Sequence, residues 1–138
     1  MNELDILART IYGEARGEYK RHDGGLASLI AVGNVIMNRV NKGGWFGSTV
    51  IDVCHRPLQF SCWNPKDPNR TLILSDFISK DPVFEVCHEV AQKLLEGTWP
   101  DLTKGSNHYH ASYCKPGWAA QADLAFKIGS HMFYKIGS

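Results

Sequence analysis

The sequence predicts an α+β fold in which several helices are followed by a few short strands. Apolar residues recur at helical spacing through residues 2–40 and 81–97. The chain after Gly97 is instead rich in His, Tyr and Ser and contains short runs typical of strands. With 138 residues, 43% of them hydrophobic and 21% charged, the chain has the size and composition of one globular domain. We therefore expect a single, mainly helical domain over residues 1–138.

The first predicted helix begins after Asn2, which is a good N-cap residue, and runs to about Arg16. One face of this helix is apolar. It contains Leu4, Leu7, Ala8, Ile11 and Ala15. Glu14 lies on the flank of that face, and Glu18 lies one turn further on, closer to its centre.

The second predicted helix runs from about Gly24 to Val40, with Asp23 as its cap. Apolar residues cover much of its circumference, which is typical of a helix at the centre of a fold. Asn34 and Asn38 interrupt this pattern four residues apart, and they therefore share one face.

The middle of the chain has weaker signals. We expect a loop over residues 41–48 and a short helix that Thr49 caps and that stops before Pro57. The prolines and asparagines of residues 58–70 predict a long loop, and residues 71–80 are ambiguous.

The last predicted helix opens with an Asp-Pro pair at residues 81–82 and ends at Gly97. Beyond it, residues 107–114, 126–128 and 132–134 are expected to form short strands or hairpin arms.

Two carboxylates one helical turn apart are the strongest indication of chemistry. Glycoside cleavage needs a shielded carboxylic acid beside open space. The C-terminal end of a helix and the neighbouring Glu18 both disfavour a charged Glu14, and so favour the protonated acid. Thr10, Gly13 and Gly17 lie beside Glu14 and are small enough to leave room for a ligand. The alternatives are a glutamate in solvent, or a pair of acids neutralised by Arg9 and Arg16.

Two further segments combine aromatic and polar side chains. Residues 59–64 have the sequence QFSCWN, which suits sugar binding or, alternatively, a loop whose Phe60 and Trp63 fill the core. His108 and His110 share one face of a predicted strand, and with Cys114 they could bind zinc. The alternative for this segment is a groove wall without metal, which we favour because no paired cysteines or acidic cluster accompany it.

The overall charge and the ends of the chain limit the expected partners. A net charge of +1 without a basic stripe does not indicate nucleic acid binding, and no apolar stretch reaches the length of a membrane span. We expect a monomer. Residues 1–5 are acidic and lack the features of a signal peptide, so synthesis in the cytoplasm is expected.

The four cysteines contain no C-x-x-C pair. We expect free buried thiols, and the alternative is that disulfides form after release into an oxidising compartment.

Four blocks, in order along the chain, resemble the SleB-like cell wall hydrolase family, typified by the spore cortex-lytic enzyme. They are residues 8–18 (ARTIYGEARGE), 31–40 (AVGNVIMNRV), 59–61 (QFS), and a C-terminal block with His108-Tyr109, Trp118 and residues 128–134 (IGSHMFY). The resemblance spans nearly the whole chain. It implies a lysozyme-like α+β fold, mainly helical, with two lobes, a small β-hairpin region and a substrate groove between the lobes.

The resemblance also implies cleavage of the β-1,4 bond between N-acetylmuramic acid and N-acetylglucosamine in peptidoglycan, with no cofactor and no metal. Many members are lytic transglycosylases that leave a 1,6-anhydromuramic end. The family's catalytic acid/base is the first glutamate of the Gly-Glu-Ala-Arg-Gly-Glu run, which here is Glu14. We expect Glu18 to orient the site. The expected glycan contacts are Gln59, Phe60, Ser61, His108 and Tyr109.

The sequence also allows different chemistry. Hydrolysis in place of transglycosylation requires a second carboxylate, for which Glu18 or Asp23 is available. A zinc-dependent amidase would use His108, His110 and Cys114, and a glycan-binding module would have no catalytic activity. Compared with the family, this chain lacks an export signal and a wall-binding region, and it has His110 where an aromatic residue is usual. The first departure suggests a phage endolysin that reaches the cell wall from the host cytoplasm through a holin.

Overall fold

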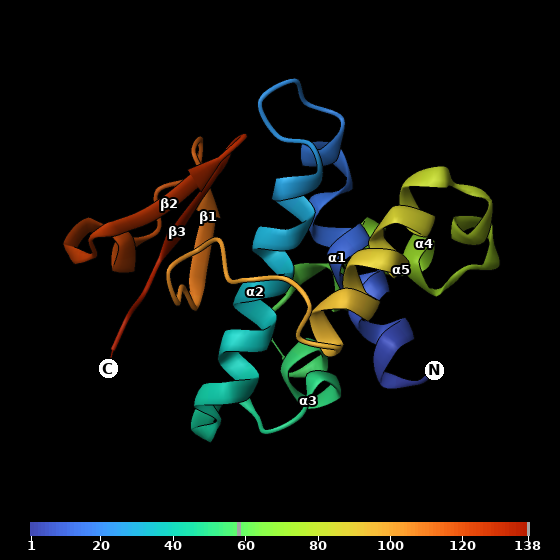
Figure 1. The fold of residues 1–138 in the computed structure, drawn as a ribbon, viewed down its shortest axis with the longest axis horizontal. Coiled ribbons are helices and arrows are strands. Elements are labelled where there is room, and N and C mark those ends of the chain that lie inside the picture. Colours follow the sequence, from blue (N-terminus) through green and yellow to red (C-terminus); the bar gives the residue numbers. More distant parts are fainter. Residues whose placement is uncertain (58, 138) are drawn as a thin grey trace.

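The structure is a computed structural model that describes residues 1–57 and 59–137 (Figure 1). Its helices pack together, and a small antiparallel sheet lies to one side of them, so the predicted mainly helical α+β fold is confirmed. The α-helices of the described residues are α1 (Glu3–Tyr19), α2 (Leu26–Lys42), α3 (Val50–His55), α4 (Pro68–Leu74) and α5 (Pro82–Leu95). Short 3-10 helices are η1 (Gly44–Phe46), η2 (Ser61–Trp63), η3 (Asp76–Lys80) and η4 (Gly117–Gln121).

Helix α1 begins as predicted but ends later. The Asn2 side chain accepts a hydrogen bond from the Asp5 backbone N–H at 2.8 Å, as an N-cap does. The helix continues to Tyr19 instead of stopping near Arg16. Gly17 does not end it, because a single exposed glycine costs a helix only about 1 kcal/mol.

Helix α2 is central, as its apolar pattern predicts, and it packs against α1, α3 and α5. Its predicted start was wrong by two residues. Gly25 is the cap, with a φ of 72° that a residue with a side chain rarely adopts. Asp23 instead forms an ion pair with Arg21 at 2.8 Å.

The two asparagines of α2 hold the segment that leads from the helices to the sheet. The Asn34 side chain accepts a hydrogen bond from the Leu102 backbone N–H at 3.0 Å. The Asn38 amide donates to Asp101 at 2.8 Å and to the Ser106 carbonyl at 2.9 Å. Their shared face therefore fixes residues 101–106 against α2.

The prediction of a long loop over residues 58–70 was wrong in part, because η2 and the start of α4 lie within this range. Leu58, the first residue of the range, is outside the described residues. The Asp67 side chain caps α4 by accepting from the Asn69 backbone N–H at 2.8 Å, and Pro68 takes the first helical position. Helix α5 starts with the same pair of residue types, where Asp81 accepts from the Val83 N–H at 2.9 Å.

The described sheet has the strand order β1-β3-β2, with β1 (His108–Ala111), β2 (Leu124–Ile128) and β3 (His131–Tyr134). Strands β2 and β3 form the expected hairpin, and β1 pairs with the other edge of β3. Phe133 of β3 is fully buried in the same hydrophobic cluster as α1, α2 and α5. The sheet is thereby fixed against the helices.

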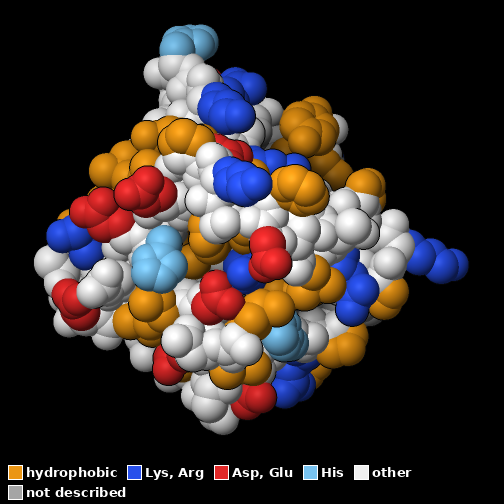
Figure 2. All heavy atoms as spheres, turned by 90° about the vertical axis from the view of Figure 1, so that its right-hand side faces the viewer, with side chains coloured by type: hydrophobic (Ala, Val, Ile, Leu, Met, Phe, Trp, Pro, Cys, Tyr) orange, Lys and Arg blue, Asp and Glu red, His pale blue; other side chains and the backbone are white. Residues whose placement is uncertain are grey.

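The face of the molecule over α4 and α5 carries acidic, basic and hydrophobic side chains interspersed, without a large area of one charge (Figure 2). This mixture agrees with the formal net charge of +1. Within the described residues, no helix combines the length and the apolar character needed to cross a membrane.

Candidate active site

Glu14 lies on α1 at the place where the sheet meets the helices, and both of its carboxyl oxygens accept hydrogen bonds. The Tyr109 hydroxyl of β1 donates to Oε1 at 2.6 Å. The Cys62 backbone N–H of η2 donates to Oε2 at 3.2 Å. The carboxyl group is partly buried. Both contacts come from donors, so each oxygen of the Glu14 carboxyl group is used as an acceptor.

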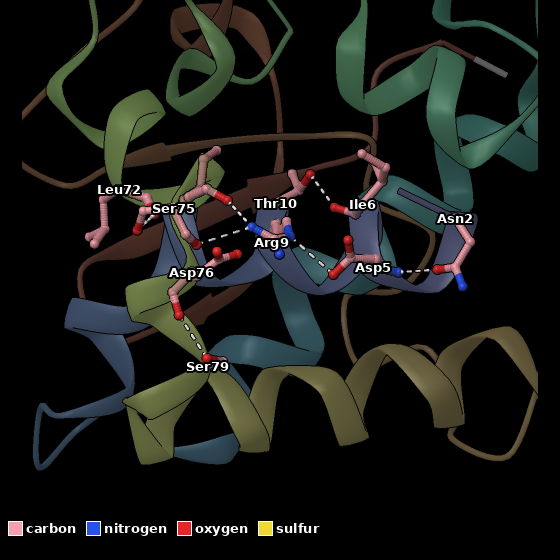
Figure 3. Close-up of polar contacts among 10 residues, drawn as sticks. Asn2, Asp5, Ile6, Arg9, Thr10, Leu72, Ser75, Asp76 and Ser79 are labelled. Carbon is pink, nitrogen blue, oxygen red and sulfur yellow. Dashed lines mark hydrogen bonds and ion pairs between the residues drawn. The ribbon is translucent and has the colours of Figure 1, made fainter.

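The arginines that could have neutralised Glu14 bind elsewhere. Arg9 pairs with Asp5 at 3.0 Å and reaches the carbonyls of Ile73 and Ser75 at the end of α4 (Figure 3). Arg16 donates to the Asn69 side chain at 2.6 Å. Neither ion pair found in the described residues includes Glu14, so its carboxyl group is not held by a salt bridge there.

The small residues beside Glu14 have different surroundings, which corrects the expectation that all of them leave room for a ligand. A Cβ on Gly13 would lie 2.8 Å from the Cys62 Cβ, so Gly13 lets η2 approach α1 closely. Thr10 is fully buried and accepts a hydrogen bond from the Trp63 indole at 2.8 Å. Only Gly17 of the three faces open space.

Glu18 is bound by the turn between β2 and β3. The Ser130 backbone N–H donates to Oε1 and the Ser130 hydroxyl donates to Oε2, both at 2.7 Å. A Cβ on Gly129 would lie 2.6 Å from Oε1, and the φ of Gly129 is 57°, so this approach requires a glycine. Glu18 therefore ties the last turn of α1 to the sheet.

Tyr109 was expected to contact glycan, and in the structure its hydroxyl group contacts Glu14. Burial, the adjacent Glu14 carboxylate and the hydrogen bond between them raise the pKa of Tyr109 well above its usual value. The phenol therefore stays protonated and remains a donor to Glu14 at neutral pH.

The three expected glycan contacts of residues 59–61 occupy different environments. Ser61 is exposed next to Cys62, the backbone donor to Glu14. Phe60 is only 1% exposed and lies in the core, which corresponds to the alternative considered for this loop. Both ends of the Gln59 amide are used internally, by Arg39 at 2.7 Å and by the Phe46 carbonyl at 2.9 Å.

The two histidines of β1 share one face, as predicted, because both rings contact Trp118. The His108 Nδ1 donates to Asn107 Oδ1 at 2.8 Å. His110 bonds the Tyr134 hydroxyl at 2.8 Å and lines a pocket of about 320 Å³. Side chains alternate along a strand, so this pocket is on the opposite side of β1 from Tyr109. Cys114 is exposed, and no three His, Cys, Asp or Glu residues of the described chain gather as metal ligands.

A family model described as Cell Wall Hydrolase matches residues 25–134, which is most of the chain. The chain belongs to the cell wall hydrolase family. This assignment agrees with three of the four sequence blocks, because the first block, residues 8–18, lies before the matched region.

A curated relative of this cell wall hydrolase is the spore cortex-lytic enzyme of Oceanobacillus iheyensis, which is 26% identical over 141 residues. The match covers 97% of the present chain and 42% of the relative, so the chain spans less than half of that protein's length. The fold is similar to the catalytic domain of SleB from Bacillus cereus, with a TM-score of 0.67, 25% identity, and coverage of 96% of this chain and 89% of that one. It is equally similar to the catalytic domain of the germination-specific lytic transglycosylase SleB from Bacillus anthracis, again with a TM-score of 0.67 and 25% identity, over 98% of this chain and 95% of that one.

Two features of this cell wall hydrolase were missed by sequence reasoning. The Cys62 backbone donor carries no sequence signal, because any residue but proline supplies an N–H. Arg39 is buried, and the available signal was a charged residue within a largely apolar helix. A charged side chain in a central helix requires partners to be buried.

Proposed function

We propose that this chain cleaves the β-1,4 bond between N-acetylmuramic acid and N-acetylglucosamine in peptidoglycan, as a lytic transglycosylase, with Glu14 as the acid/base. The observation that carries the proposal is the environment of Glu14. It is a partly buried carboxyl group, free of salt bridges to described residues, held by Tyr109 and by the Cys62 N–H at the junction of α1, η2 and β1. Membership of the cell wall hydrolase family supports the substrate class.

The proposed reaction uses one carboxyl group twice. Protonated Glu14 gives its proton to the bridging oxygen as the bond from that oxygen to the muramic C1 breaks, which releases the 4-hydroxyl of N-acetylglucosamine. The resulting carboxylate is stabilised by the two donors. The muramic 6-hydroxyl then bonds to C1 and returns its proton to Glu14. The products are a 1,6-anhydromuramic end and the regenerated acid.

The positions of the other carboxylates favour this route over hydrolysis. A hydrolase needs a second carboxylate that activates water or attacks C1. Both oxygens of Glu18 accept from Ser130, and Asp23 is paired with Arg21. Neither group is available near the sugar without breaking these contacts.

We further propose that the glycan lies along the junction of sheet and helices and contacts Ser61, which is exposed there. Of the other predicted contacts, the half-buried Gln59 has both ends of its amide used internally. His108 is also half-buried and lies on the face of the edge strand β1 opposite Tyr109, so a glycan that contacts it also passes the edge of that strand. Burial, together with Arg39 and Lys42, lowers the pKa of His108 to about 4, so at neutral pH this ring is uncharged. A neutral imidazole can bond a sugar hydroxyl or an acetamido group without the cost of burying a charge.

The replacement Glu14→Gln tests the assignment. It keeps the shape of the side chain and removes the transferable proton, so we expect the rate of peptidoglycan cleavage to fall by at least about 1,000-fold with an unchanged melting temperature. Mass spectrometry of a wild-type digest should show anhydromuramic ends. Reducing ends would indicate hydrolysis, released peptides would indicate an amidase, and a folded Glu14→Gln protein that lyses walls normally would refute the role of Glu14.

We also propose that the chain acts as a phage endolysin, made in the host cytoplasm and released through a holin. Its free thiols support synthesis in a reducing compartment, because Cys54, Cys62 and Cys87 are buried without forming disulfides. Expression in a bacterium with and without a pore-forming holin tests this. Lysis only with the pore supports the proposal, and equal lysis without it contradicts it.

A further inference from the structure

We propose that Arg39 is a positioning residue for this reaction: its buried guanidinium fixes the segments that hold Glu14 and supplies the positive charge that stabilises the Glu14 carboxylate after proton transfer. The inference depends on the acid/base role proposed for Glu14. Arg39 comes from α2 and is only 7% exposed.

The hydrogen bonds of Arg39 connect the two segments from which the Glu14 donors come. Its Nε donates to the Asn107 carbonyl at 2.8 Å, directly before β1, which carries Tyr109. Its Nη1 donates to Gln59 Oε1 at 2.7 Å, three residues before Cys62. One rigid guanidinium thereby sets the positions of both donors relative to α1.

Arg39 is buried without an acidic partner bound to it. Its guanidinium carbon lies 4.9 Å from the centre of the Phe46 ring and 5.0 Å from that of Phe60, and its hydrogen bonds go to neutral oxygens. Neither ion pair found in the described residues includes it. Burial lowers the pKa of Arg39, but a guanidinium remains charged in proteins. A buried charge of this kind is costly and requires an electrostatic counterpart.

The described groups whose shifted pKa depends on the nearby Glu14 charge identify this counterpart. Cys54 of α3, Cys62 of η2 and Tyr109 of β1 interact with Glu14, and burial raises the pKa of each, so all three are neutral at pH 7. Glu18, on the same helix, is bound to Ser130. Arg39 is the cation among these groups, and Tyr109 and Glu14 both act to raise its pKa, which burial lowers.

This arrangement predicts a change in the pH dependence of the reaction. Activity is lost at high pH when the acid loses its proton before the substrate is cleaved. Removing the cation favours the protonated acid, so the alkaline limb of the rate profile should move to higher pH by roughly half a unit or more. The maximal rate should fall, because the carboxylate formed during cleavage loses its stabilising charge.

The experiment measures the rate of anhydromuramic end formation from purified peptidoglycan against pH, with folding at each pH checked by circular dichroism. Arg39→Met removes the charge and the hydrogen bonds. Arg39→Lys keeps the charge and loses the simultaneous hydrogen bonds to Asn107 and Gln59. Lys42→Met, which removes an exposed cation from the same helix, is the matched control. We expect the alkaline limb to move in Arg39→Met alone, and the rate to fall in both Arg39 variants.

A second route does not require deleting a buried residue, in case Arg39→Met does not fold. Gln59→Glu places a carboxylate at the position that now lies 2.7 Å from Arg39 and neutralises it in place. We expect the alkaline limb to shift in the same direction as in Arg39→Met. The inference is overturned if the limb stays at its wild-type pH in Gln59→Glu, or if Arg39→Lys shifts it as far as Arg39→Met. An active Glu14→Gln protein would instead overturn the proposed function itself.

Discussion

Tyr109 provides the most direct test of the site at the scale of single residues, because its hydroxyl hydrogen is committed to Glu14. The hydrogen bond is short, at 2.6 Å, and its acceptor is an ionisable oxygen. Such charge-assisted bonds are stronger than neutral ones. The other Glu14 donor is a backbone N–H, which ordinary mutagenesis leaves in place.

The change Tyr109→Phe removes this hydroxyl and keeps the ring. We expect peptidoglycan cleavage to slow by about 10-fold to 100-fold, because one donor to the carboxylate formed in the reaction is lost. Tyr113→Phe is the matched control, since Tyr113 is 87% exposed. The rates should be compared under identical conditions. Equal rates for the two variants would show that the phenol does not assist Glu14.

His108 makes the stability of the fold depend on pH. Its pKa is about 4 in the folded chain and about 6.5 in an unfolded one. Between these values the unfolded chain binds a proton that the folded chain does not, so the contribution to stability is full above pH 6.5 and is lost as the pH falls toward 4. On acidification from pH 7 to pH 4.5, we expect the wild type to lose roughly 1–3 kcal/mol more unfolding free energy than His108→Gln loses.

Urea denaturation at the two pH values measures this difference. His22→Gln serves as the control, because His22 is exposed on the loop between α1 and α2. If His108→Gln and the wild type lose the same unfolding free energy on acidification, the histidine does not account for the acid sensitivity.

At the scale of elements, the end of α1 and the β2–β3 turn are stabilised by each other. The Ser130 contacts of Glu18 join residues that are 112 positions apart. The Gly129 backbone N–H also donates to the Asp23 carbonyl at 3.0 Å, in the loop after α1. We call the contacts of Glu18 with Ser130 and of Asp23 with Gly129 the tether. Because the tether holds the last turn of α1 against the sheet, the helix extends past Gly17 to Tyr19.

Removing the tether should affect stability more than chemistry. We expect Ser130→Ala and Glu18→Gln each to reduce the unfolding free energy by about 1–3 kcal/mol, because a partly buried polar partner is left unpaired. Thermal melts measure the loss, with the exposed Ser112→Ala as control. Both variants should keep most of the lytic rate. A Glu18→Gln protein with normal melting and no activity would assign Glu18 a direct chemical role.

Capping residues in the sequence correctly predicted the start of several helices. Asn2, Thr49 and Asp81 were recognised as caps, and each accepts the expected backbone hydrogen bond. Helix α4 was missed although Asp67 and Pro68 repeat the pair that predicts α5. The surrounding prolines and asparagines suggested a loop, and a seven-residue helix has too short an apolar pattern to outweigh them.

The candidate site was only partly predictable, for a physical reason. Glu14 was identified from its local run of residues, but its donors lie 48 and 95 positions away. No local pattern encodes such contacts. For the same reason Phe60 was expected at the glycan, whereas its ring packs against Arg39 in the core. Side-chain type indicates which chemistry is available, and tertiary packing decides which of these side chains reach the surface.

At the scale of the whole molecule, the cysteines report on the integrity of the core. Cys54, Cys62 and Cys87 are fully buried, and burial raises the pKa of Cys54 and of Cys87 to about 12. Cys114 is exposed. Since thiolates are the reactive form, we expect a chromogenic disulfide reagent to modify one thiol rapidly in the native protein and four in denaturant. Rapid reaction of two or more native thiols would show that the core opens readily.

The strand order β1-β3-β2 has a consequence for the time at which the protein becomes active. The last strand in the sequence is the middle strand of the sheet, and it is the strand that β1 pairs with to bring Tyr109 to Glu14. A nascent chain on the ribosome therefore carries the acid long before it can complete the hydrogen bonds around it. Residues 131–134 must first leave the exit tunnel and dock, so the lytic potential of the proposed enzyme arises only after this last strand of the sheet has emerged from the ribosome.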